Sequence, residues 1–144
     1  MTLDEVKKRF VEEVKLRAYD DKYIDKNEER EILQQAIQMG VSVDSARGAL
    51  AQVCEANGYI IESRVLSQVK DIIDTFAGND GHIDEKEFKD AITTCEKACQ
   101  GKRTHVQCAK MVIGVIEDNS YKVKSGGWFH SDWYAKAKHD AGMA

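Results

Sequence analysis

The sequence predicts an all-α protein, a single-domain bundle of six or seven helices with two pseudo-repeated halves. Three observations favour this fold class. The chain of 144 residues contains no proline, the strongest breaker of helices. Its apolar residues recur at helical spacing in successive segments, which short polar stretches separate. With 42% apolar and 32% charged residues, the composition is typical of a globular protein and not of a disordered one.

Capping residues mark the ends of the first three expected helices. A Thr-x-x-Glu capping box at Thr2 begins the first helix, and Asp25 precedes the second. Gly40 suits the left-handed residue that ends the second helix, and Ser42 suits the start of the third, which Asn57-Gly58 ends. Their buried faces are expected to hold Leu3, Val6, Phe10 and Val14, then Ile32, Leu33, Ala36 and Ile37, then Ala46, Leu50, Val53 and Cys54.

The second half of the chain continues this pattern. A fourth helix carries an apolar face, the glycine-rich segment 78–82 forms a turn, and a fifth helix follows it. Thr104 is a suitable N-cap for a sixth helix, residues 118–127 read as a loop, and a last helix follows. The seven expected helices span about residues 2–19, 26–39, 42–57, 62–76, 84–99, 104–117 and 131–140.

An internal repeat is the most informative feature of the sequence. Residues 21–28 and 80–87 share the pattern Asp-x-aromatic-Ile-Asp-x-x-Glu, and residues 57–62 form a weaker third copy without the second Asp. We expect one domain over residues 1–144, with the repeats in a core of about 10–99 and an aromatic segment over about 121–141.

One interpretation of the repeat is purely structural. Asp25 and Glu28 have the spacing of a capping box, as do Asp84 and Glu87. In such a box the Asp side chain accepts a hydrogen bond from a free amide of the first turn, and the Glu side chain accepts one from the amide of the Asp. Each repeat would then begin a helix.

The other interpretation is a divalent-cation site, Ca²⁺ or another hard cation, at Asp80, Asp84 and Glu87. This segment resembles the second half of an EF-hand loop when Gly81 is set at position 6. Positions 1 and 3 then lack side-chain oxygens, so the expected site is weak or irregular. A weaker one is expected at the equivalent residues Asp21, Asp25 and Glu28.

The repeated pattern between helices resembles the tellurite-resistance TerB-like family over about residues 10–95. Members typically show an Ala-Asp-Gly-x-Ile-Asp-x-x-Glu stretch at the start of each of two related halves, and residues 21–28 and 80–87 match these positions. Lys22 stands where the family prefers glycine. The resemblance implies an all-helical interaction module, linked to stress responses or the cell envelope, and leaves a metal association open.

The four cysteines are expected to be free thiols in a reducing cytosol, because the chain shows no export signal. Cys95, Cys99, His105 and Cys108 lie at helical spacing on two successive helices, so a tetrahedral zinc site is one hypothesis. Neighbouring Lys97, Lys102 and Arg103 would favour the thiolate forms. The alternative is that these cysteines are ordinary core residues.

Four aromatic residues lie close together near the C-terminal end: Trp128, Phe129, Trp133 and Tyr134. They either cover the bundle or form an interface with a partner protein, because Trp and Tyr are enriched at interface hot spots. The net charge of −4 and pI of about 5.6 argue against a nucleic-acid partner. No apolar run is long enough to insert in a membrane.

No complete catalytic motif occurs. We therefore predict a non-enzymatic, cytoplasmic helical interaction module of the TerB-like type, with an unknown protein partner and oligomeric state. The two alternatives are an EF-hand-like calcium-responsive sensor and a small cytosolic enzyme that uses carboxylates or a cysteine.

Overall fold

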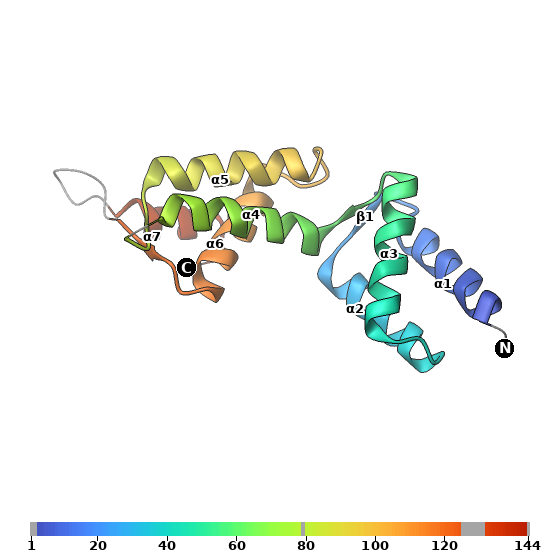
Figure 1. The fold of residues 1–144 in the computed structure, drawn as a ribbon. Coiled ribbons are helices and arrows are strands. Elements are labelled where there is room, and N and C mark those ends of the chain that lie inside the picture. Colours follow the sequence, from blue (N-terminus) through green and yellow to red (C-terminus); the bar gives the residue numbers. More distant parts are fainter. Residues whose placement is uncertain (1–2, 79, 125–131, 144) are drawn as a thin grey trace. The chain divides into compact units, whose positions relative to one another are not determined.

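The computed structural model describes residues 3–78, 80–124 and 132–143. Within these residues the chain forms seven helices and four strands of two residues each, which confirms the all-α fold class (Figure 1). The chain divides into two compact units, residues 1–64 and residues 65–144. None of the described helices combines the length and the apolar character needed to cross a bilayer.

The first unit contains three helices and two paired strands. Its elements are α1 (Leu3–Arg17), β1 (Tyr23–Ile24), α2 (Lys26–Gln38), α3 (Val43–Asn57) and β2 (Ile60–Ile61). The core consists of one apolar face from each helix together with Ile24 and Ile61 from the strands. Those faces were expected from the spacing of the apolar residues. Ile37 is an exception, because it is exposed on α2.

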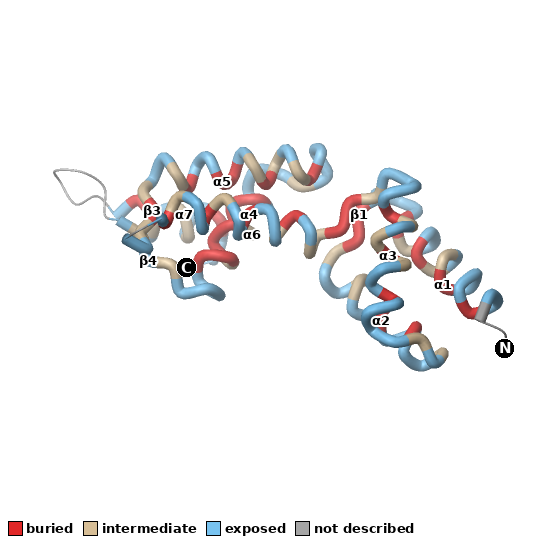
Figure 2. Tube along the Cα trace, viewed as in Figure 1, coloured by how far each residue is buried: buried red, intermediate tan, exposed pale blue. Residues whose placement is uncertain are grey.

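The second unit has a similar order of elements. It contains most of α4 (Glu62–Ala77), then β3 (His82–Ile83), α5 (Glu85–Ala98), α6 (His105–Asp118), β4 (Lys122–Val123) and α7 (Trp133–Asp140). Buried and exposed positions alternate along α5 and α6 with the helical period (Figure 2). The buried positions of α5 and α6 meet in the core of this unit, where Phe88 also contacts Trp133 of α7.

Each unit contains a short pair of parallel strands. Tyr23 pairs with Ile60 in the first unit, and His82 pairs with Lys122 in the second. A residue with left-handed backbone lies just before each of the four strands: Lys22, Gly58, Gly81 and Ser120, with φ of 57°, 70°, 70° and 58°. Gly81 adopts this conformation without strain, whereas Lys22 and Ser120 carry a Cβ atom that disfavours it.

The strand β4 shows that the repeat has a fourth copy. Residues 119–124 were expected to be part of a loop, but they follow the third copy, residues 57–62, position by position. Both copies place a tyrosine directly after the left-handed residue and then an extended pair. The last helix begins at Trp133, two residues later than expected, after its N-cap Asp132. The expected cap at Thr2 lies outside the described residues.

Candidate functional site

The two acidic repeats form capping boxes. Asp84 Oδ1 accepts a hydrogen bond from Glu87 N at 2.7 Å, and Glu87 Oε1 accepts one from Asp84 N at 3.0 Å. Asp25 and Glu28 form the same two bonds at 2.8 and 3.2 Å. The expected capping boxes are therefore confirmed, and one oxygen of each of these carboxylates is directed to the start of its own helix.

Lys124, which directly follows β4, supplies a positive charge to the second acidic repeat. Lys124 Nζ lies 2.9 Å from Asp80 Oδ2, while Asp80 Oδ1 accepts a hydrogen bond from His82 N at 3.0 Å. The hydrogen bond from Lys124, followed by that from His82 N, lowers the pKa of Asp80. The pKa of Lys124 is raised chiefly by Asp80, with smaller contributions from the charges of Glu87 and Asp84. An ammonium group of the chain is therefore paired with the first carboxylate of this repeat.

The first acidic repeat differs, because among the described residues no lysine pairs with its Asp21. Its structural counterpart of Lys124 is Glu62, whose Oε2 accepts a hydrogen bond from Lys26 N at 2.8 Å. Asp21 Oδ1 accepts a hydrogen bond from Tyr23 N at 3.1 Å, as Asp80 does from His82. The pKa of Glu28 is raised, chiefly by burial and further by the nearby charges of Asp25 and Asp21.

The carboxylates of the two repeats do not converge on one point. Among the described residues, the only set of three or more possible ligands with donor atoms within 4.8 Å of one another consists of cysteines. The cation site expected at Asp80, Asp84 and Glu87, and its weaker counterpart at Asp21, Asp25 and Glu28, is therefore not assembled. The physical reason is that these oxygens already serve as helix caps, turn acceptors and the partner of Lys124.

Three of the four residues of the expected zinc site do lie together. The Sγ atoms of Cys95, Cys99 and Cys108 are within 4.8 Å of one another, and all three residues are fully buried. His105 does not join them. Its side chain is 71% exposed, and its Nδ1 lies 3.0 Å from Glu96 Oε1. As the first residue of α6, His105 lies at the surface of the unit while Cys108 lies in the core.

Burial, and not the nearby basic residues, dominates the pKa of two of these thiols. Burial raises the pKa of Cys108 to about 11 and raises that of Cys95 further. No lysine or arginine contributes to either shift. Cys54, which is buried alone in the first unit, also has its pKa raised by burial to about 11. Neutral thiols are poor nucleophiles, so none of these three is prepared for nucleophilic catalysis.

The aromatic residues near the C-terminal end pack within the second unit. Trp133 is 7% exposed, its ring centroid is 5.4 Å from that of Phe88, and its indole N–H donates to the Lys124 carbonyl at 2.6 Å. Most of the Trp133 ring is therefore buried, where it completes the core of the second unit. Tyr134 is half-buried, and its hydroxyl donates to Glu117 Oε1 at 3.2 Å. The other two expected interface residues, Trp128 and Phe129, lie outside the described residues.

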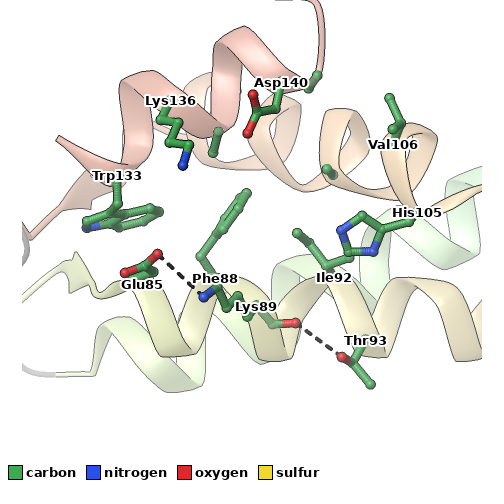
Figure 3. A pocket seen from close by; sticks show the side chains of 13 residues that line it. Glu85, Phe88, Lys89, Ile92, Thr93, His105, Val106, Trp133, Lys136 and Asp140 are labelled. Carbon is green, nitrogen blue, oxygen red and sulfur yellow. Dashed lines mark hydrogen bonds and ion pairs between the residues drawn. The ribbon is translucent and has the colours of Figure 1, made fainter.

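A groove of about 470 Å³ lies among α5, α6 and α7 (Figure 3). Its apolar lining consists of Phe88, Ile92, Val106, Ala109, Trp133, Ala137 and Ala141. Its polar lining consists of Glu85, Lys89, Thr93, His105, Lys136 and Asp140. In the close view, Lys136 and Asp140 extend from α7 toward α5, where Phe88 and Ile92 lie. This groove was not expected from the sequence. Val106, a large apolar residue of its lining, is 53% exposed.

Comparisons of the chain with protein-family models, with curated proteins and with solved structures found no match.

Proposed function

We propose that the chain is a non-enzymatic helical interaction module of the TerB-like type, and that the groove among α5, α6 and α7 binds an amphipathic helix of a partner protein. The observation that carries this proposal is the groove itself, which has an apolar lining and is bordered by three helices. Grooves of this kind accept the apolar face of a helix, whose side chains at i, i+3 and i+4 fill the space.

The charges around the groove support a protein partner. Two carboxylates, Glu85 and Asp140, and two ammonium groups, Lys89 and Lys136, are among the lining residues. This balance of charge suits the mixed polar flanks of an amphipathic helix. It does not suit a polyanion such as a nucleic acid, which requires an excess of basic groups.

Val106 offers an opportunity to test the groove without disturbing the core. Its side chain is 53% exposed, and it is the second residue of α6. An acidic residue in the first turn of a helix is compatible with the helix dipole, so Val106→Asp is expected to fold. Val43 is a matched control, because it is 39% exposed and is the first residue of α3 in the other unit.

The experiment selects peptides from a phage-displayed library of amphipathic helices and then titrates the best peptide into labelled protein, followed by NMR. We expect chemical-shift changes at α5, α6 and α7. We expect Val106→Asp to weaken binding by about tenfold or more, because the complex would bury a carboxylate against apolar side chains. Val43→Asp should bind as the native chain does.

Two results would contradict the proposal. One is a selection that enriches no peptide for the native chain. The other is a peptide that binds Val106→Asp and Val43→Asp with equal affinity, since its site would then lie elsewhere.

A further inference from the structure

Three buried thiols from two helices meet in the second unit. Cys95 and Cys99 are one turn apart at the end of α5, and Cys108 lies in the first turn of α6. All three residues are 0% exposed, and their Sγ atoms lie within 4.8 Å of one another. Bonds of about 2.3 Å from three sulfurs to one central ion would place the sulfurs about 4 Å apart. The fold therefore holds these donors near the required spacing before any ion binds.

The donors decide which class of ion could bind here. Thiol sulfurs favour soft, thiophilic ions over the hard cations that carboxylates bind. A further soft donor is near, because Met111 Sδ lies 4.0 Å from Cys95 Sγ. A structural zinc ion usually takes four nitrogen or thiolate ligands. The nitrogen ligand expected for it, His105, is exposed and paired with Glu96.

The charge of the complex decides among the soft ions. Three thiolates carry three negative charges, so a monovalent ion would leave a charge of −2 and a divalent ion a charge of −1. No lysine, arginine or histidine is buried among the described residues, so no buried cation could balance either charge. Burying an unbalanced charge is strongly unfavourable. Only a trivalent ion gives a neutral complex with three thiolates.

We propose that Cys95, Cys99 and Cys108 form a binding site for a trivalent thiophilic ion, which enters as its neutral hydroxide. For arsenous acid, the probe of this class, the reaction is As(OH)₃ + 3 Cys–SH → As(S–Cys)₃ + 3 H₂O. Three As–O bonds break and three As–S bonds form, and each thiol proton leaves with a hydroxide as water. The oxidation state of arsenic does not change, and no charge enters the core.

The site also has a structural consequence, because it joins two helices. Cys99 is the C-cap of α5, and the connection to α6 contains the left-handed residues Gln100 and Gly101. An ion bound to Cys95, Cys99 and Cys108 would fix this turn and link α5 to α6. Because it binds only the folded chain with three sulfurs in place, it should raise the midpoint of thermal unfolding.

The test uses the full, reduced chain and sodium arsenite, with native mass spectrometry and titration of free thiols after rapid denaturation. We expect one arsenic per chain, and the number of reactive thiols should fall from the four free cysteines to one. Cys99→Ala and Cys108→Ala each remove one ligand and should weaken arsenic binding by more than about 100-fold. Loss of a residue that only hydrogen-bonds to a metal ligand already weakens binding by roughly 10- to 100-fold. Cys54→Ala, which removes the buried thiol of the other unit, should retain the full affinity.

Circular dichroism of each variant confirms that it is folded before binding is measured. The proposal is overturned if the native chain takes up no arsenic, or if Cys54→Ala loses as much affinity as Cys108→Ala. It is also overturned if Zn²⁺ or Cu⁺ binds to the three cysteines more tightly than arsenite does, because the argument from charge would then fail.

Discussion

Asp84 offers a direct test of whether an acidic repeat serves as a helix cap or as a ligand. The substitution Asp84→Ala removes the acceptor of the 2.7 Å hydrogen bond from Glu87 N and leaves that amide without its partner. Loss of an N-cap acceptor costs about 1 kcal/mol. In a chain of this size, that loss lowers the midpoint of thermal unfolding by roughly 2–4 °C. Asp84→Asn removes the charge but keeps an acceptor, and Asn caps helices about as well as Asp.

Thermal unfolding followed by circular dichroism, in buffer with a calcium chelator, separates the two roles. We expect Asp84→Ala to unfold roughly 2–4 °C lower than the native chain, and Asp84→Asn within about 1 °C of it. Asp90→Ala, at an exposed position inside α5, is the control for removing a carboxylate. Added calcium should leave all four midpoints unchanged. Asp84 is not a cap if Asp84→Asn is as unstable as Asp84→Ala, and it is a ligand if calcium stabilises the native chain and not Asp84→Asn.

Three further substitutions test other contacts. Burial raises the pKa of Glu28 above its value in the unfolded chain. The protonated side chain therefore stabilises the fold fully below the unfolded-state pKa, and this stabilisation is lost as the pH rises through the folded-state pKa. In urea unfolding at pH 7, Glu28→Gln should therefore be more stable than the native chain, whereas near pH 4 the two should be equally stable. An equal gain in stability at both pH values would contradict this. Lys124→Gln should raise the pKa of Asp80 in an NMR titration, and Lys122→Gln should not; an unchanged Asp80 would refute the pairing. Phe88→Ala removes a buried ring and should lower the free energy of unfolding by about 3–5 kcal/mol, measured in urea; a loss below about 1 kcal/mol would mean that the ring is not core.

Features that depend on local chemistry could be predicted from the sequence. Most helices begin and end within two residues of the expected positions, because a cap and its acceptor lie three residues apart. The Asp25 and Asp84 capping boxes and the N-cap Thr104 follow from that spacing alone. The inward faces follow from the helical period, which also placed the three cysteines of α5 and α6 on facing sides.

Features that depend on contacts between distant residues could not be predicted in this way. The partner of Asp80 is Lys124, which lies 44 residues further along the chain and does not belong to the acidic pattern. The groove is formed by three helices, and no single helix carries a signal for it. His105 has the right spacing to accompany Cys108, but its position at the start of α6 allows it to turn outward to Glu96.

Equivalent positions in the two units, Glu62 and Lys124, hold side chains of opposite charge. Glu62 and Lys124 each lie four residues after a left-handed residue, Gly58 and Ser120, and directly follow the strand that pairs with an acidic repeat. Glu62 adds a further acceptor for the free amide at the start of α2, and so strengthens the cap at the expense of more negative charge.

Lys124 instead neutralises Asp80 and leaves the cap of α5 to Asp84 and Glu87 alone. The repeat that most resembles an EF-hand loop is thus the one in which a lysine pairs with the first Asp of the pattern. The side chain at the position of Glu62 and Lys124, which lies outside the acidic pattern, thus decides whether a carboxylate or an ammonium group contacts each repeat.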